Sequence, residues 1–580
     1  MRKLLCFLSC VFLLIGGATA QTRVVTGKVT DASGNPIPSA SVVIKGTRRG
    51  TNTGQDGSFR LTVPATAKTI VVSSVGFSPL EVSIDGISDV PVQLTAQAKN
   101  DLQDVVVVGY GTQRKRDLTG AVYKLKDSTM ADIPVQGPDQ ALRGKVPGVQ
   151  VVQSSGTPGA AISVQIRGNG TINTSSQPLY VVDGVILNTG SYSQLDANMG
   201  GQVMNALADI NPNDIESYEI LKDAAAAAIY GSRGANGVVL ITTKKGANEK
   251  TKVTLDASLG TQSPWKKIPT LTGPQYITLV NEELMNAFGI NAAQAGLSSL
   301  ANPPDSYPTT RWQDLIFRHD PLYNYQLSVA GGDAKTKIYA SANYTGNDGI
   351  ILGSDYRRYG ARINIDHTVN SRFKISGEMA ATRSITNRIN NDNNIYGVLS
   401  TAVLMPTYFK PYNPDGSYAY DPNLGIIENP VASARLRFNQ AKTNSVVGDM
   451  AAEYFFLPNL SLRAQGSVDY VGFNEFQFLP SNTLEGATGP NGIGRQGYSA
   501  DLNLLNEETL TWHQSFGDHN VTVTAVASYQ EDQFQNIFAE GHNFPGNGIQ
   551  ELSAASTPIT TTSGSSNVGT IGYLGRVNYD

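Results

Sequence analysis

The side chains that could carry out chemistry are few in this chain and lie far apart. The sequence contains no HExxH, GxSxG or P-loop motif, and Gly137–Lys145 lacks both the spacing and the final Ser or Thr of a phosphate-binding loop. The five histidines are scattered over the second half: His319, His367, His513, His519 and His542. His513 and His519 flank a predicted tight turn, where a solvated pair is favoured over a metal-bound one. We therefore expect no catalytic residues, no metal site and no cofactor.

The first 20 residues predict a signal peptide. A basic head (Arg2, Lys3) precedes an apolar run and a small-residue cleavage site, and the run is too short to span a membrane. Both cysteines, Cys6 and Cys10, lie in this segment, and Cys10 falls inside the apolar run, which argues against lipidation. The mature chain then has no cysteine for disulfides, thiolate catalysis or metal binding.

The charge balance also excludes a class of partner. Without Arg2 and Lys3, the 44 basic residues fall to 42 against 48 acidic ones, which leaves a formal charge of −6. A nucleic-acid-binding protein would normally show a concentrated basic face. We therefore expect no nucleic-acid partner.

A run of four valines is the most unusual segment. It lies in a linker over residues 96–115 and comprises Asp104, Val105, Val106, Val107, Val108, Gly109 and Tyr110. One interpretation is an exposed strand that pairs with the sheet edge of another protein, with backbone hydrogen bonds supplying the affinity. The alternative is a buried strand of the next domain, because an exposed apolar strand invites aggregation.

A second candidate site is an aromatic cluster in a long predicted loop. The sequence MPTYFKPYNPDGSYAYDP joins turn-forming residues to five aromatic ones: Tyr408, Phe409, Tyr412, Tyr418 and Tyr420. Aromatic faces can stack on sugars and their polar tips can bind hydroxyl groups. Alternatively, these rings pack the loop itself or form an interfacial belt.

Two small domains are predicted, one on each side of the valine-rich linker. Residues 21–95 contain short strand-like runs separated by turn-forming residues, as in Asp31–Pro36, which predicts a β-sandwich. Residues 116–246 mix strands with helical segments, including an alanine-rich run from Asp223 to Tyr230 before Gly231, and predict a compact α/β unit.

Residues 247–580 show a strict alternation of apolar and polar residues. In Ile338–Gly346, and again in Leu460–Tyr470, Ala361–Asp366 and Val521–Tyr529, every second side chain is apolar or small. This period places one face of each strand in an apolar medium and the other in water. A soluble antiparallel sheet with one solvated face would show the same alternation.

Connection lengths favour a membrane barrel over that alternative. Tight turns are predicted at Gly331–Asp333, Val369–Ser371, Leu457–Asn459 and Phe516–Asp518, and long segments follow Gly346, Thr382, Tyr470 and Gln530. Short turns on one side and long loops on the other are typical of outer-membrane barrels. About ten strands are expected, from one near Lys252–Gly260 to a last one at Gly572–Asp580. Such a sheet would have open edges, so we expect the chain to be a fragment.

The motifs resemble a known family. The stretches GKVTDASGNPIPSASVVIKGT and GQDGSFRLTV resemble carboxypeptidase-regulatory-like domains, and the segment contains no histidine for a metal site. The stretches VVVVGYGTQRKRDLTGAV, ALRGKVPGVQV, VQIRGNGTI, PLYVVDGV and INPNDIESYEILKDAAAAAIYGSRGANGVVLITTKKG resemble SusC/RagA-type TonB-dependent receptors, in the expected order. The resemblance implies a mainly β chain: β-sandwich, mixed α/β plug domain, and the first half of a barrel of about 22 strands.

The resemblance also implies a function. Asp104–Tyr110 would be the TonB box, through which TonB and its inner-membrane energising complex drive import. Partners would be a SusD-like surface lipoprotein, an oligosaccharide or peptide substrate and outer-membrane lipid. A surface binding or adhesion protein that uses the barrel as an anchor is the alternative function. A secreted enzyme is excluded by the missing catalytic set.

Overall fold

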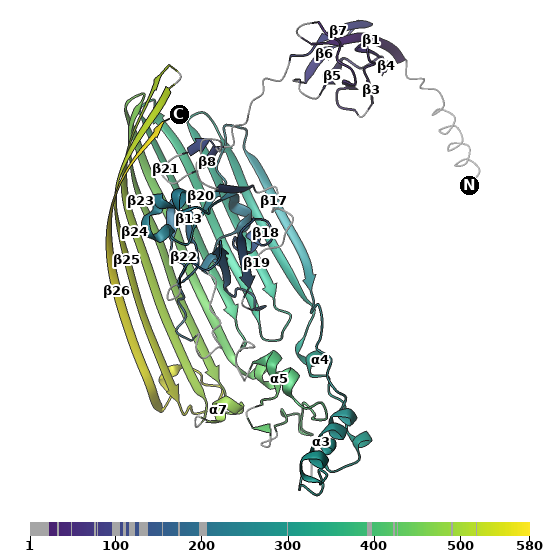
Figure 1. Ribbon diagram of the computed structural model, residues 1–580, viewed down its shortest axis with the longest axis vertical. Coiled ribbons are helices and arrows are strands. Elements are labelled where there is room, and N and C mark those ends of the chain that lie inside the picture. Colours follow the sequence, from purple (N-terminus) through teal and green to yellow (C-terminus); the bar gives the residue numbers. More distant parts are fainter. Residues whose placement is uncertain are drawn as a thin grey trace, which may run out of the picture. The chain divides into compact units, whose positions relative to one another are not determined.

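The computed structural model is mainly β and divides into two compact units at Asp104 (Figure 1). Among the described residues, none of the helices combines the length and the apolarity needed to cross a membrane. The description covers residues 22–579 except 32–33, 48, 75–76, 78, 96–104, 108–111, 115–121, 127–136, 154, 172–174, 196–205, 298–299, 391–396, 421–423, 426, 489–490 and 518.

The first unit is a β-sandwich with its own apolar core. One sheet has the strand order β4-β1-β7 and the other β3-β2-β5-β6. Alternate residues point inward: in β1, Val25 and Val29 are fully buried between exposed Thr26 and Lys28. The strands are β1 (Thr22–Thr30), β2 (Ser41–Ile44), β3 (Gly50–Asn52), β4 (Ser58–Pro64), β5 (Thr69–Ser73), β6 (Leu80–Ser83) and β7 (Asp89–Gln93).

The second unit begins with the α/β domain, which we call the plug. Its sheet has the order β10-β15-β16-β13-β14, beside the hairpin β11–β12. The alanine-rich run forms α2 (Ala224–Ala227) and continues as η7 (Ala228–Gly234), which kinks at Gly231. The other elements are β10 (Val122–Lys126), η3 (Gln140–Leu142), β11 (Val149–Gln153), β12 (Ile162–Ile166), β13 (Leu179–Val182), β14 (Val185–Leu187), η5 (Ala206–Asp209), η6 (Pro212–Asp214), β15 (Ile215–Leu221) and β16 (Val238–Thr243).

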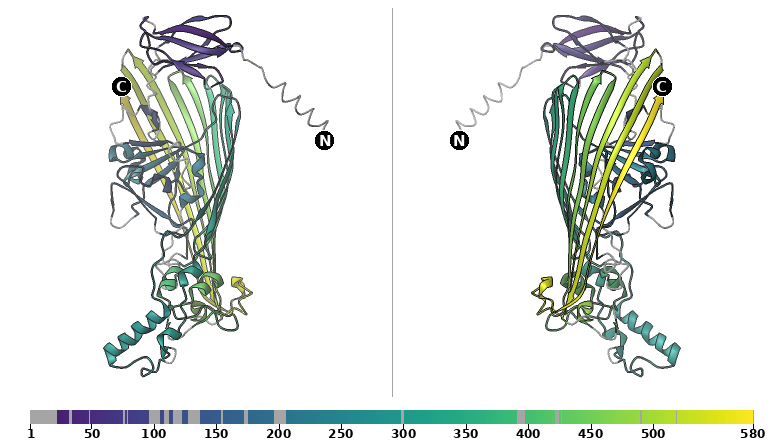
Figure 2. Two further views of the ribbon diagram at one scale, coloured as in Figure 1. Left: turned by 90° about the vertical axis from the view of Figure 1, so that its right-hand side faces the viewer. Right: turned by 90° about the vertical axis from the view of Figure 1, so that its left-hand side faces the viewer.

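Ten antiparallel strands then follow one another in chain order and form a single sheet, with the plug against one face (Figures 1 and 2). The expected number of strands in this sheet is confirmed. The strands are β17 (Lys252–Gln262), β18 (Asp320–Gly332), β19 (Thr336–Asp348), β20 (Asp355–Asn370), β21 (Phe373–Asn387), β22 (Phe438–Leu457), β23 (Leu460–Leu479), β24 (Ile493–Phe516), β25 (His519–His542) and β26 (Thr557–Tyr579).

The faces of this sheet are inverted relative to a soluble protein. The face against the plug buries polar side chains, such as Ser341 and Asn364, whereas the opposite face exposes Leu255 (70%), Met450 (75%) and Ile571 (66%). On β25 this apolar outer row runs from Val521 to Tyr529, roughly the nine residues that a tilted strand needs to cross a bilayer. A row of tyrosines with neighbouring rings borders it on β18–β20: Tyr323, Tyr325, Tyr344 and Tyr359. The arrangement matches a lipid-facing belt with an aromatic border.

The connections are short at one end of the sheet and mostly long at the other. Tight turns were predicted at Gly331–Asp333, Val369–Ser371, Leu457–Asn459 and Phe516–Asp518. Short connections are present at all four places, and the first three lie at residues 333–335, 371–372 and 458–459. The expected long segments after Gly346, Tyr470 and Gln530 are wrong in extent. β19 continues to Asp348, β23 to Leu479 and β25 to His542, because strand pairing continues beyond the apolar belt.

The end of the sheet with the long connections is called here the outer end. Two long segments at this end, 263–319 and 388–437, pack together, and we call them the external segments. Their helices are α3 (Gly273–Phe288), α4 (Trp312–Ile316), α5 (Val398–Leu404) and α6 (Pro430–Leu436), and the short η9 (Pro304–Ser306) lies beside α3. Two more short helices, α7 (Leu484–Thr488) and η11 (Leu552–Ala554), lie in the later connections. Trp312, Val398 and Met405 are buried in a shared apolar core.

Candidate functional site where the plug meets the sheet

The valine-rich segment forms half of a small hairpin. Val105–Val107 is strand β8, paired antiparallel with β9 (Thr112–Arg114), so that Val106 lies opposite Gln113. In the described part of the chain no third strand joins this pair. Asp104, Val108, Gly109 and Tyr110 lie outside the described residues. A two-stranded hairpin leaves a free backbone edge on β8 that a further strand could join.

Buried arginine and amide side chains bind the plug to the face of the ten-stranded sheet (β17–β26) that lies against it, which we call the wall. Arg358 of β20 donates to the carbonyl oxygens of Ala208, in η5 (2.8 Å), and of Ile210, directly after η5 (3.1 Å). Nearby, Asp214 of the plug accepts from Gln326 and Tyr339, both at 2.8 Å. Because each of these wall groups is buried, its hydrogen bonds to the plug must be kept or replaced when the plug moves.

A second anchor involves the turn between β13 and β14. Asp183, with a φ of 50°, accepts from the backbone N–H of Thr243 (2.9 Å) and from its hydroxyl (2.6 Å). The Thr243 hydroxyl oxygen accepts in turn from Arg362 (3.2 Å) and Asn364 (3.0 Å) of β20. One plug hydroxyl therefore joins an acidic turn to two polar side chains of the wall.

The plug segment 188–195 meets a row of wall carboxylates. Glu475 of β23 accepts from the Ser193 hydroxyl (2.7 Å) and from the backbone N–H groups of Gln194 and Leu195. Asp501 of β24 accepts from Tyr192 (3.3 Å). Burial, reinforced by Asp501 and then Asp469, raises the pKa of the Tyr192 phenol well above its usual range, so it remains a donor.

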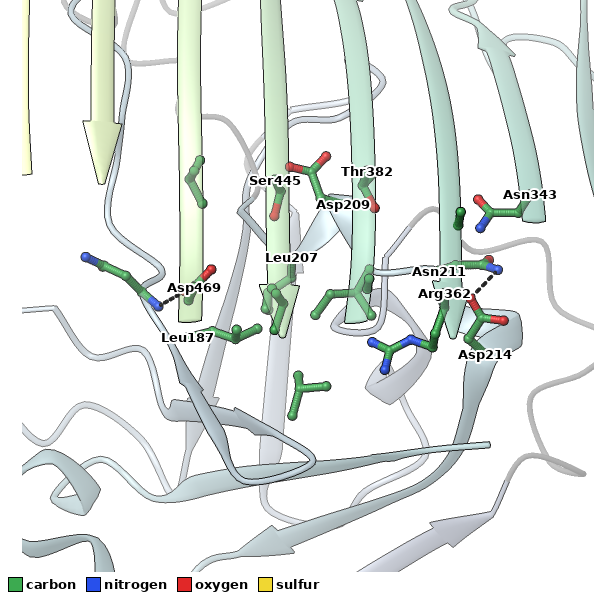
Figure 3. A pocket seen from close by; sticks show the side chains of 17 residues that line it. Leu187, Leu207, Asp209, Asn211, Asp214, Asn343, Arg362, Thr382, Ser445 and Asp469 are labelled. Atoms are coloured by element: carbon green, nitrogen blue, oxygen red, sulfur yellow. Dashed lines mark hydrogen bonds between the residues drawn. The ribbon is translucent and has the colours of Figure 1, made fainter. Parts of the chain in front are cut away.

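A cavity of about 40 Å³ lies between plug and wall (Figure 3). Plug residues Leu207, Asp209 and Asn211 line one side, and Arg362 and Asp469 line the other. Burial raises the pKa of Asp209 to about 6, although a hydrogen bond from Ser384 and the charge of Arg358 oppose this shift. The volume and the polar lining suit ordered water.

Comparisons with known proteins identify the domains. Residues 114–238 match the TonB-dependent Receptor Plug Domain and residues 25–108 match the CarboxypepD_reg-like domain. The TonB-dependent receptor P3 of Formosa agariphila is 32% identical over 98% of this chain and 54% of its own length. The TonB-dependent receptor SusC of Bacteroides thetaiotaomicron is 30% identical over 100% of this chain and 57% of its own. The two domain matches and these relatives support a SusC/RagA-type TonB-dependent receptor.

Solved structures agree with this family assignment. The structure of the RagAB peptide transporter superposes with a TM-score of 0.66 at 25% identity, over 79% of this chain and 53% of that one. The expected family and fold class are therefore confirmed. The chain spans about half the length of the curated relatives it matches.

The aromatic cluster of this TonB-dependent receptor is divided between packing and exposure. The ring of Tyr408 lies 5.5 Å from Tyr276 and 5.8 Å from Tyr307, within the external segments. Phe409 and Tyr418 pack against the shared apolar core. Tyr412 (44%) and Tyr420 (52%) remain exposed, and the ring of Tyr412 lies 5.5 Å from that of Tyr418.

The histidines remain apart from one another. Within the described ranges, no group of His, Cys, Asp and Glu side chains is arranged to hold a metal ion. His513 and His519 do flank a turn, but His513 bonds Thr522 and His519 bonds Tyr579. Sequence reasoning missed the wall residues Arg358, Arg362 and Glu475, because polar residues are common on every inner strand face.

Proposed function

We propose that this receptor imports an oligosaccharide or peptide nutrient across the outer membrane, driven by TonB and assisted by a SusD-like surface lipoprotein. The observation that carries the proposal is the inverted sheet, which is apolar on its outer face and contacts the plug through polar side chains, with a valine-rich strand ahead of that plug in the chain. We propose the domain boundaries as a leader at 1–20, β-sandwich at 21–95, linker at 96–115, plug at 116–246 and barrel strands from 247.

The proposed mechanism uses the free edge of β8. TonB would add a strand to Asp104–Tyr110, and several backbone hydrogen bonds loaded together would transmit force to the plug. The plug's own edge strand β10 lies next along the chain and pairs only with β15 within the described residues. Its Lys124 forms an ion pair with the buried Glu219 of β15 at 2.9 Å, and displacement of β10 would break this pair.

The substrate class rests on family likeness and on exposed tyrosines. Tyr412 and Tyr420 provide stacking faces at the outer end, suited to sugar rings. The structural neighbour RagAB is described as a peptide transporter, so peptides stand beside oligosaccharides as candidate cargo.

Deletion of Asp104–Tyr110 from the full-length receptor tests the coupling. We expect uptake of the cognate nutrient to be abolished while its binding to whole cells persists. Val106→Pro should act like the deletion, because proline removes a backbone donor, and Val106→Ile is the matched control that keeps it. Unchanged uptake in the deletion variant would favour the surface binding or adhesion alternative.

A further inference from the structure

An ion pair with no solvent exposure lies between the external segments and the plug. Arg388, the first residue after β21, donates through Nη2 to Glu475 Oε2 at 2.7 Å, and both side chains are 0% exposed. The same carboxylate binds the plug through Ser193, Gln194 and Leu195. Glu475 therefore touches the plug on one side and the base of segment 388–437 on the other.

Arg388 is tied to both ends of that external segment. Its backbone N–H donates to the carbonyl oxygen of Asn439 (2.8 Å) and its Nε donates to the Asn439 side chain (3.2 Å), just inside β22. Its neighbour Ile389 belongs to the apolar core shared by the external helices.

The plug segment that Glu475 holds is bound by three strands. Ser499 of β24 donates to the carbonyl oxygen of Tyr192 (2.8 Å), and Asn536 of β25 donates to the side chain of Gln194 (3.2 Å). Arg358 and Arg362, which hold other parts of the plug, lie within strand β20 and donate to plug atoms directly. Arg388 instead acts on the plug through a carboxylate, from the base of an external segment.

We propose that the Arg388–Glu475 pair couples external segment 388–437 to plug segment 188–195. The proposal rests on the import function above and adds its regulation. A carboxylate balanced by a guanidinium is a strong acceptor for the plug N–H groups, and withdrawing Arg388 leaves a buried charge without its counterion. Arg388 Nη1 has no hydrogen-bond partner among the described residues, so this guanidinium has a donor free for a second arrangement. Coupling is reciprocal, so plug withdrawal would also loosen the segment.

Hydrogen–deuterium exchange of the full-length receptor tests this coupling without measuring uptake. Peptides covering 188–195 should exchange about tenfold faster in Arg388→Gln than in wild type, with Arg388→Lys between them. Arg495→Gln is the matched control, because Arg495 is also buried at the outer end but lies in β24, outside segment 388–437, and pairs with Glu485 and Glu540, neither of them in the plug. It should leave the exchange of 188–195 unchanged.

Two results would overturn the coupling. One is equal protection of 188–195 in Arg388→Gln and wild type. The other is equal loosening by Arg495→Gln, which would indicate general damage to the outer end. If Arg388→Gln does not fold, Arg388→Lys serves alone, because it keeps the charge but loses the planar guanidinium, and equal protection of 188–195 in that variant and wild type overturns the coupling. Loss of TonB-dependent uptake in the box deletion, together with unchanged exchange here, would retain the import function and reject the coupling alone.

Discussion

The N-terminal sandwich and the ten-stranded sheet use the same alternation of side chains but bury opposite faces. In β1 the apolar Val25 and Val29 are covered and the polar residues between them are exposed. In β19 the apolar Ile338 is 41% exposed, whereas Ser341 is only 7% exposed. The alternation therefore predicts that a strand has two faces and does not predict which face is covered.

The two regions bury opposite faces because different structures cover their sheets. The sandwich packs two apolar faces on each other, so water suits its outer side. The large sheet packs its polar face on the plug through side chains such as Arg358 and Gln326. Its apolar side chains therefore lie on the outer face, and this face needs an apolar medium.

Phe59→Ala in the sandwich should cost about 3–5 kcal/mol, because it empties a buried aromatic site in a small core. Phe59 is 4% exposed on β4. Urea unfolding of the 22–95 segment measures the change. Arg60→Ala, at the exposed neighbouring position, is the control and should shift stability by less than about 0.5 kcal/mol.

Ile363→Arg on the outer face of the large sheet should cost about 2–4 kcal/mol in the bilayer, because it places a charge in lipid. In a soluble sheet the same exposed position, 43% accessible, would accept arginine at little cost. The measurement is the fraction of full-length receptor inserted in a heat-modifiable form. Normal insertion of this variant, equal to that of Ile363→Val, would contradict a lipid-facing belt.

Sequence patterns predicted the strands of this sheet but not their full length. Between Val521 and Tyr529 the outer side chains of β25 are apolar or aromatic, and the strand was expected there. Beyond Tyr529 the outer positions are Glu531, Gln533 and Gln535, and this change of polarity resembles the start of a loop. Pairing with β26 nevertheless continues to His542, because backbone hydrogen bonds do not require an apolar face.

The candidate site was predictable only where local sequence carried the signal. The valine run stands out by composition, and its strand Val105–Val107 is present in the structure. Arg388 and Glu475 lie 87 positions apart, and neither has a neighbour pattern that distinguishes it from other polar residues. Their pairing depends on the register of β21, β22 and β23, which only the assembled sheet sets.

Thr243→Val should weaken the hold of the inner face on the plug by about 1–3 kcal/mol, because Asp183, Arg362 and Asn364 each lose a buried partner. The full-length receptor is heated, and the protease sensitivity of the plug is measured as the readout of its release. Thr242→Val, one residue earlier on β16 and on its other face, is the control. Equal sensitivity of the two variants would mean that this hydroxyl does not anchor the plug.

The plug should become more stable as pH falls from about 7 to about 4, by on the order of 1–2 kcal/mol. Burial raises the pKa of Asp209 to about 6, above its usual 3.8, so the native carboxyl binds its proton more tightly than the unfolded one. This contribution is lost as pH rises through 6. Plug release measured against pH should lose this slope in Asp209→Asn, and an unaltered slope would assign it to another group.

The smallest effect concerns a polar exception on the outer face. Glu508 of β24 faces outward beside Ala464 of β23 and Ala527 of β25, and it accepts from Asn506 at 2.8 Å. A carboxylate in the lipid-facing belt is costly. The hydrogen bond from Asn506 and the position of Glu508 near the end of the belt reduce that cost. Glu508→Leu should therefore stabilise the inserted receptor by at most about 1 kcal/mol. Denaturant resistance in lipid vesicles measures it, with the inward-facing Glu507→Leu as the opposite case, expected to destabilise. Destabilisation by Glu508→Leu would show that this part of the outer face contacts something other than lipid.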